Sequence, residues 1–155
     1  ERGGKLVPSF PQAKHIIAKP EWEKGLSGGS SSYHKEIFEA LQGNIDLTLV
    51  EGSGEFKPGI RYEHSGGHSP YHMVIWIEDS GGKCFFGGDE LPEPEQLIRK
   101  FIAKYDYDGR KAMQLREQYG KIAAAEGWTC LFYHAKSLCV GNISYNEDHF
   151  MVRPA

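Results

Sequence analysis

The chain has 155 residues, with 18 Lys and Arg against 21 Asp and Glu, which gives a formal net charge of -3. This length suits one domain with a sizeable core, and the charge balance excludes the overall basic character that attracts nucleic acid or anionic lipid. The longest apolar runs, such as residues 73–77, fall far short of the roughly 20 residues that cross a membrane, so we expect no membrane partner.

The first 30 residues are predicted to form an arm that ends in a flexible loop. Pro8, Pro11 and Pro20 interrupt this segment, and only residues 15–18 form a short apolar stretch. The run 25–32 consists mainly of Gly and Ser, which favour loops. We therefore predict an N-terminal arm and loop over residues 1–30 and a single globular domain over residues 31–155.

An early helix and several strands are predicted next. Ser31 or Ser32 is a suitable N-cap for a helix that runs to about Gln42. From Ile45 apolar and polar residues alternate, which predicts a strand, and a Gly-rich turn at 52–54 reverses the chain. Further strands are predicted over residues 60–63, 72–79 and 84–86, the last two joined by a Gly-Gly hairpin turn.

A central pair of helices and a final set of strands complete the prediction. Pro94 suits the first turn of a helix whose apolar residues recur at three- and four-residue spacing through Tyr105. A second helix is predicted to end near Glu126, with Gly127 as its left-handed stop. Three strands follow, over 128–135, 138–145 and 149–153. The predicted fold class is α+β, with a mixed or mainly antiparallel sheet, the central pair of helices packed on one face, and one early helix.

Three histidines at four-residue intervals, His64, His68 and His72, form the first candidate site. Imidazole ligates metals and exchanges protons near neutral pH, and three protein ligands leave an open position on zinc for water. Gly and Pro residues place the triplet in a loop. Three interpretations stay open: zinc binding by the triplet, metal-free acid–base chemistry, and a polar loop without a chemical role. His149 is a further candidate for the same site.

A second candidate site depends on a predicted two-residue turn at Lys136 and Ser137. In that register His134 lies opposite Cys139, with Cβ atoms about 5 Å apart. The resulting thiolate–imidazolium pair would be able to attack an amide or thioester. A shift of one residue separates the pair, and the alternative is a buried Cys139 with His134 exposed at a strand end.

The three cysteines, Cys84, Cys130 and Cys139, each lie in an apolar stretch. They cannot all pair, and none shows the CxxC spacing of zinc ribbons or redox motifs. We interpret them as free core residues, which is compatible with a reducing compartment such as the cytoplasm. No signal peptide is visible, but a chain that begins at Glu1 is also compatible with a segment of a longer polypeptide. Localisation therefore stays open.

Other motifs are incomplete. The segment His34-x-Glu36 lacks the Pro-Cys-x-x-Cys that accompanies it in zinc deaminases. Segments 71–79 and 148–153 resemble the histidine motifs of murein endopeptidase-type zinc peptidases, but Met151 stands where the second histidine is expected. No phosphate-binding glycine loop is present. None of these motifs assigns a reaction.

Two functional hypotheses follow. The first is a small hydrolytic domain, of the toxin or effector kind, that acts on an amide or phosphodiester bond of a protein or small polar substrate. Its histidine loop would supply acid–base or metal chemistry, and zinc is the expected metal. The alternative is a noncatalytic protein-binding module, such as an inhibitor, immunity or adaptor domain, that uses exposed aromatic residues and Gly-rich loops.

Overall fold

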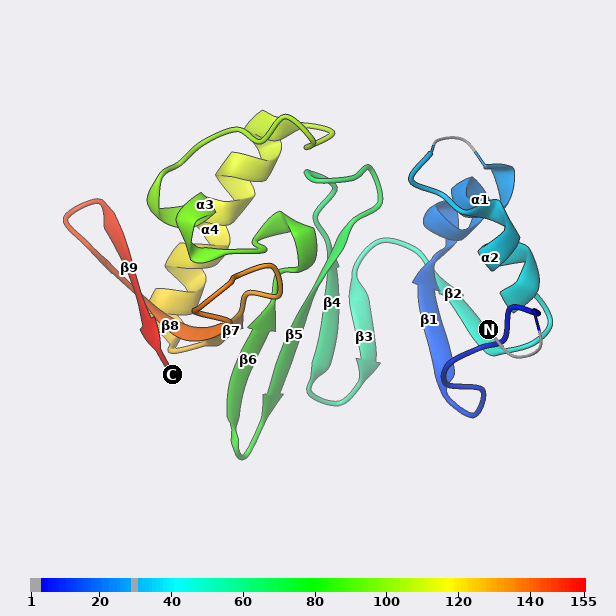
Figure 1. Ribbon diagram of the computed structural model, residues 1–155. Helices are drawn as coiled ribbons and strands as arrows, with labels where there is room; N and C mark the ends of the chain where they lie inside the picture. The colour runs from blue at the N-terminus through cyan, green and yellow to red at the C-terminus, as the bar shows by residue number, and fades with distance from the viewer. Residues whose placement is uncertain (1–3, 29–30) are drawn as a thin grey trace. The chain divides into compact units, whose positions relative to one another are not determined.

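A computed structural model describes residues 4–28 and 31–155 (Figure 1). Residues 1–3 and 29–30 of the predicted N-terminal arm and loop lie outside the described residues. The chain divides into two compact units, Glu1–Gly52 and Ser53–Ala155. The domain boundary predicted near residue 30 differs from this division and stays a prediction. Among the described residues, no helix is long and apolar enough to cross a membrane.

The described part of the first unit, residues 4–28 and 31–52, combines a parallel strand pair with two helices. Strand β1 (Lys14–Ala18) pairs in parallel with β2 (Asp46–Val50), and α1 (Lys19–Ser27) and α2 (Lys35–Leu41) lie between them in the sequence. The side chain of Trp22 is 4% exposed and contacts Phe38 edge-on, with ring centroids 5.4 Å apart. The indole of α1 and the phenyl ring of α2 therefore join the two helices.

The early helices differ in detail from the prediction. Helix α2 corresponds to the predicted early helix, but its N-cap is His34 rather than Ser31 or Ser32. Helix α1 was not predicted, because its proline was interpreted as an interruption. Pro20 instead occupies the first turn of α1, where the missing N–H group has no intrahelical partner to lose. A proline near a helix start thus marks the beginning of this helix.

The second unit, all of whose residues the structure describes, contains a seven-stranded sheet in the order β3-β4-β5-β6-β7-β8-β9. Neighbouring strands are antiparallel throughout, except that β6 and β7 are parallel. The predicted mixed or mainly antiparallel sheet is therefore confirmed. The strands are β3 (Gly54–Lys57), β4 (Ile60–His64), β5 (Met73–Asp79), β6 (Gly82–Phe86), β7 (Thr129–Leu131), β8 (Val140–Asn146) and β9 (His149–Pro154).

The long helix α4 (Gly109–Glu126) packs against β8 and covers part of this sheet (Figure 1). Its start is capped by Asp108, whose carboxylate accepts the Lys111 N–H at 3.0 Å. Its end is capped by Gly127 in the left-handed conformation at φ 72°, as predicted. The core beneath it is aromatic, with Trp76, Phe85, Tyr119, Trp128 and Phe132 all at most 3% exposed.

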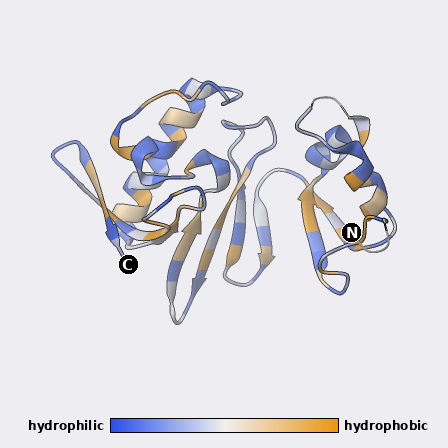
Figure 2. Cartoon of the chain, in the orientation of Figure 1, coloured by the Kyte–Doolittle hydropathy of each residue, from blue (hydrophilic) through white to orange (hydrophobic). Residues whose placement is uncertain are grey.

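The hydropathy of the residues along the strands follows the position of this core. Strand β5 is hydrophobic over its first part and becomes hydrophilic at Glu78 and Asp79, near the turn into β6 (Figure 2). Trp76 packs against Phe85 across the β5–β6 pair with the two rings tilted by 38° and their centroids 4.2 Å apart. Aromatic pairs of this kind add to the free energy gained from burial. The hydrophobic end of this hairpin is formed by the start of β5 and the end of β6. It therefore adjoins the loops that follow β4 and β6.

The first helix of the predicted central pair is shorter than expected. Helix α3 (Pro94–Ile98) ends before the last turns of the predicted apolar stripe, and Lys100 has a φ of 47°. The chain instead forms a loop whose Tyr107 N–H donates to His68 O and whose Asp108 N–H donates to Gly67 O, each at 2.9 Å. Within the segment that was predicted to continue the helix, Phe101 O instead accepts a hydrogen bond from Arg116 Nη1 at 3.4 Å, and a central pair of helices on one face stays a prediction.

Candidate active site

Three loops meet at one edge of the seven-stranded sheet. Strands β4 and β6 are both antiparallel to β5, and β6 is parallel to β7, so β4, β6 and β7 run in the same direction. Their carboxyl ends therefore lie at the same edge. His68 follows β4, Asp89 follows β6, and His134 follows β7. Strand direction thus brings together three side chains that are far apart in the sequence.

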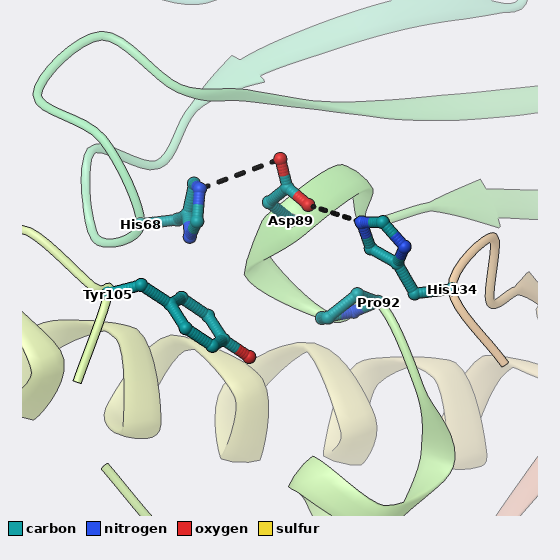
Figure 3. Close-up of a pocket in the computed structure, with 5 residues that line it drawn as sticks. All are labelled: His68, Asp89, Pro92, Tyr105 and His134. Atoms are coloured by element: carbon teal, nitrogen blue, oxygen red, sulfur yellow. Dashed lines mark ion pairs between the residues drawn. The ribbon is translucent and has the colours of Figure 1, made fainter. Parts of the chain in front are cut away.

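These three side chains line a cavity of about 350 Å³, together with Pro92 and Tyr105 (Figure 3). The Asp89 carboxylate lies between the two histidines: its Oδ2 is 3.5 Å from His68 Nε2, and its Oδ1 is 3.3 Å from His134 Nε2. The side chains of His68 and Asp89 are 22% and 34% exposed. Solvent and a small ligand can therefore reach the carboxylate.

A buried carboxylate holds the other ring nitrogen of His68. Asp106 Oδ1 is 3.2 Å from His68 Nδ1, and Asp106 Oδ2 accepts a hydrogen bond from Arg116 Nη2 at 2.8 Å. The side chains of Asp106 and Arg116 are 0% and 1% exposed. Because an ionised carboxylate only accepts, it retains the proton of a neutral His68 ring on Nδ1. The lone pair of Nε2 then lies on the side of Asp89.

Two hydrogen-bond acceptors, His68 Nε2 and the Asp89 carboxylate, therefore face each other. An imidazole lone pair facing a carboxylate oxygen is unfavourable unless the ring carries a second proton or a cation lies between them. Two imidazole nitrogens and a carboxylate are also a donor set that suits zinc. Within residues 4–28 and 31–155, however, no group of three or more His, Cys, Asp or Glu side chains is placed to hold a metal ion by itself. The chemistry of His68, Asp89 and His134 therefore fits one side of a metal site, not a closed one.

Tyr133 holds the same carboxylate from a different direction. Its hydroxyl donates a hydrogen bond to Asp89 Oδ1, and its ring lies over His134, with centroids 4.1 Å apart. Partial burial, together with this hydrogen bond, raises the pKa of Tyr133 above its ordinary value. The hydroxyl therefore stays protonated and continues to donate to Asp89 at neutral pH.

The rings of His68 and His72 contact each other edge-on, with centroids 5.8 Å apart, but the nitrogens of the three predicted histidines have different partners. His64 Nε2 is 2.9 Å from the carbonyl oxygen of Pro70. His72 Nδ1 is 2.8 Å from Ser65 Oγ, and His72 Nε2 accepts the Asp89 N–H at 3.1 Å. His68 is the member of the triplet that lines the cavity. Since both nitrogens of His72 face protein groups, this geometry does not support His64, His68 and His72 as one set of zinc ligands.

The predicted pairing of His134 with Cys139 depends on a register that is wrong. The β7–β8 ladder ends at Leu131 opposite Val140, and the Phe132 N–H donates to Cys139 O at 2.8 Å. Phe132 therefore lies opposite Cys139. The chain leaves the sheet earlier than predicted, because the His134 N–H bonds to Pro92 O at 3.1 Å. That bond directs His134 to Asp89.

His149 begins β9 opposite Asn146, at the closed end of the last hairpin. Among the described residues, the hydrogen bonds and ion pairs of His64 and His68 do not involve His149. These contacts thus do not support its predicted contribution to the histidine site.

The cysteines are free, and they differ in exposure, which gives a chemical prediction. Cys130 is buried and Cys139 is exposed, with its S–H group 3.2 Å from Ala135 O. Burial raises the pKa of the Cys130 thiol to about 12. We expect iodoacetamide to label Cys139 in the folded protein and Cys130 only after unfolding, as measured by peptide mass spectrometry. Equal labelling rates at both positions would contradict the structure.

Sequence reasoning selected His68 and His134 but not the carboxylates beside them. Asp89 comes three residues after the end of β6, as His134 comes three residues after β7. A polar residue shortly after the predicted strand 84–86 was therefore a usable signal for Asp89. Asp106 gave no such signal, because it does not follow a predicted strand. It comes directly after the helix that apolar spacing predicted through Tyr105.

Comparisons with known proteins agree with this fold. Residues 5–134 match the family model described as the metallo-beta-lactamase superfamily, and this segment includes His68, Asp89 and His134. The match covers most of the sequence, so the chain belongs to that superfamily. A search of curated proteins gave no significant match.

Solved structures of similar fold support the assignment. A probable metal-dependent hydrolase from Staphylococcus aureus is 26% identical, with a TM-score of 0.73, over 91% of this chain and 52% of that one. A hydrolase of the beta-lactamase superfamily is 18% identical, with a TM-score of 0.77, over 94% of this chain and 56% of that one. The dizinc quorum-quenching lactonase AidC is 16% identical, with a TM-score of 0.70, over 90% of this chain and 54% of that one. The chain thus spans about half the length of these proteins, and the last two show the fold alone.

Proposed function

We propose that this chain contributes to a metal-dependent hydrolase, with His68, Asp89 and His134 as metal ligands. The observation that carries the proposal is the Asp89 carboxylate, whose two oxygens face imidazole Nε2 atoms at 3.5 and 3.3 Å. Membership of the metallo-beta-lactamase superfamily supports the same reaction class. The hydrolase and zinc hypotheses from the sequence are therefore retained, while the ligand set changes from the histidine triplet to residues of three different loops.

The protein groups around these ligands have separate tasks. Zinc, when bound, supplies Lewis acidity and lowers the pKa of water. Asp106 keeps the proton of His68 on Nδ1, so that Nε2 is available as a donor atom to a metal. Tyr133 holds the Asp89 carboxylate in place through Oδ1. Pro92 and the Tyr105 ring form the apolar part of the cavity wall, which favours a substrate over bulk water beside the carboxylate.

The substrate class we propose is a small ester, with a lactone ring as the first to test. A cavity of about 350 Å³ suits a small molecule rather than a folded protein. One of the similar structures is described as a lactonase in complex with a product, N-hexanoyl-L-homoserine. Amide and phosphodiester bonds, which the sequence analysis favoured, are the competing outcomes of the same substrate assay. The toxin or effector role and the alternative of a protein-binding module stay predictions.

Zinc titration of matched histidine variants tests the ligand set. His68→Ala and His134→Ala should each weaken zinc binding by at least about 100-fold, because each removes a proposed ligand, whereas loss of an outer contact typically costs 10–100-fold. His64→Ala and His149→Ala are the controls, since those side chains lie outside the cavity lining, and both should bind zinc like the wild-type chain.

The measurement is competition with a chromophoric chelator, paired with hydrolysis assays on a lactone, an amide and a phosphodiester. Equal losses in all four variants, or a wild-type chain that does not bind zinc, would refute this ligand set.

A further inference from the structure

Two loops that carry proposed ligands are tied to each other by hydrogen bonds in both directions. We call residues 65–72 the histidine loop and residues 87–91 the aspartate loop. From the histidine loop, His72 Nε2 accepts the Asp89 N–H at 3.1 Å. From the aspartate loop, Glu90 Oε2 accepts the N–H groups of Gly67 and His68 at 3.2 and 3.3 Å. Each loop therefore fixes the backbone of the ligand-bearing residue in the other.

The tautomer of His72 follows from its partners. A backbone N–H can only donate, so His72 Nε2 must accept and the ring proton lies on Nδ1. Nδ1 is 2.8 Å from Ser65 Oγ, and that hydroxyl donates to the carbonyl oxygen of His72 at 3.1 Å. The ring is thus held from the side opposite to Asp89. This arrangement fixes the orientation of the imidazole that receives the Asp89 N–H.

Glu90 is fully buried, although it is a carboxylate, and its contacts explain its position. Its side chain is 0% exposed, and Oε2 accepts the two N–H groups of the histidine loop. Oε1 has no hydrogen-bond partner among the described residues and lies against Gly67, where a Cβ atom would come within 2.3 Å. Without the carboxylate, the buried Gly67 N–H and the His68 N–H would lose their acceptor.

We infer that His72 and Glu90 are positioning residues that set the separation of the His68 and Asp89 side chains. His72 acts on the backbone of Asp89, and Glu90 acts on the backbone of His68, so the two side chains work as a reciprocal clamp between the loops. This role differs from the zinc ligation that the sequence suggested for His72. The inference rests on the proposed function, because ligand separation matters only if the two side chains bind a common group.

Amide hydrogen exchange of the metal-free full chain is the first arm of the test. His72→Ala should speed exchange of the Asp89 amide at least about tenfold, because the acceptor of that N–H is removed. It should also shift the ring nitrogen resonances of His68. Glu90→Gln should preserve slow exchange at Gly67 and His68, since the amide oxygen still accepts, whereas Glu90→Ala should not. His64→Ala is the matched control, because its ring contacts Pro70 within the histidine loop and makes no bond to the aspartate loop in the described structure.

Zinc affinity of the same variants is the second arm, and His72→Ala should lower it by about 10–100-fold relative to His64→Ala. If His72→Ala matches His64→Ala in Asp89 amide exchange and in the His68 resonances, or in zinc affinity where the wild-type chain binds zinc, the clamp does not position the ligands. Should Glu90→Ala fail to fold, the comparison of His72→Ala with Glu90→Gln and His64→Ala still decides. A wild-type chain without zinc affinity would refute the proposed function, and amide exchange and the His68 resonances would then judge the clamp by themselves.

Discussion

Replacement of Arg116 by Met is expected to lower the free energy of unfolding by about 3–5 kcal/mol, because it removes the guanidinium partner of the buried Asp106 carboxylate. Arg116 is 1% exposed, and its Nη2 lies 2.8 Å from Asp106 Oδ2. Its Nε also donates to Glu90 O at 2.7 Å. Met fills a similar volume, so the effect reports the lost charge and hydrogen bonds. Urea denaturation followed by circular dichroism measures it.

Lys121→Met is the control on the same helix. Lys121 pairs with Glu117 at 2.8 Å within α4, and these side chains are 46% and 35% exposed. The Lys121 ammonium also lies over the Tyr145 ring, 5.1 Å from the centroid, so we expect Lys121→Met to lower the free energy of unfolding only slightly, and by much less than Arg116→Met does. A small effect of Arg116→Met, similar to that of Lys121→Met, would show that the Asp106 carboxylate does not depend on the guanidinium.

Gly67→Ala, which adds a methyl group, is expected to lower the melting temperature and to weaken zinc binding at the candidate site. An alanine Cβ would lie 2.3 Å from Glu90 Oε1 and 2.8 Å from the Cα of Ala112, and both neighbours are fully buried. Overpacking of this kind costs about 1–3 kcal/mol. Since the neighbours cannot move freely, the loop must shift and carry His68 with it. Thermal melting and zinc titration of Gly67→Ala should therefore both change.

Gly81→Ala separates this effect from the general consequences of replacing glycine. A Cβ at Gly81 would meet Asp79 Oδ1 at 3.1 Å in the exposed β5–β6 turn. That oxygen also accepts the Gly81 N–H at 2.7 Å, but it lies in an exposed turn where a slight shift relieves the contact, and alanine restricts the unfolded chain more than glycine does. The variant should melt close to the wild-type temperature. Equal behaviour of the two variants would mean that the histidine loop accommodates a methyl group without rearrangement.

The fold was predictable where local pattern and tertiary structure agree. The alternation from Ile45, the run from Met73 and the cap at Gly127 each identified an element that the structure contains. The prediction of a helix through Tyr105 was wrong: α3 ends at Ile98, and the loop that follows is held by the N–H groups of Tyr107 and Asp108, which bond to the histidine loop. These hydrogen bonds join residues about 40 positions apart in the sequence, and apolar spacing within one segment contains no information about them.

The site was predictable only in part. Histidine spacing drew attention to His68, although four-residue intervals have no special meaning in a loop. His134 was selected for a cysteine partner that it does not contact, since the predicted register of β7 and β8 was wrong. Asp89 was missed, because its place beside the histidines follows from the parallel pairing of β6 with β7. Pairing between strands so distant in the sequence has no local signature.

The parallel pairing of β6 and β7 also has a consequence for the order of folding. The connection between these strands contains α3, the loop that includes Asp106, and α4, so their pairing closes a long stretch of chain. The hairpin of β5 and β6 closes only a short loop and can form early, whereas contacts between distant segments form slowly. Asp89 and His134 should therefore meet late. A fluorescent or metal probe at this pair would report the final step of folding, after the hairpins have formed.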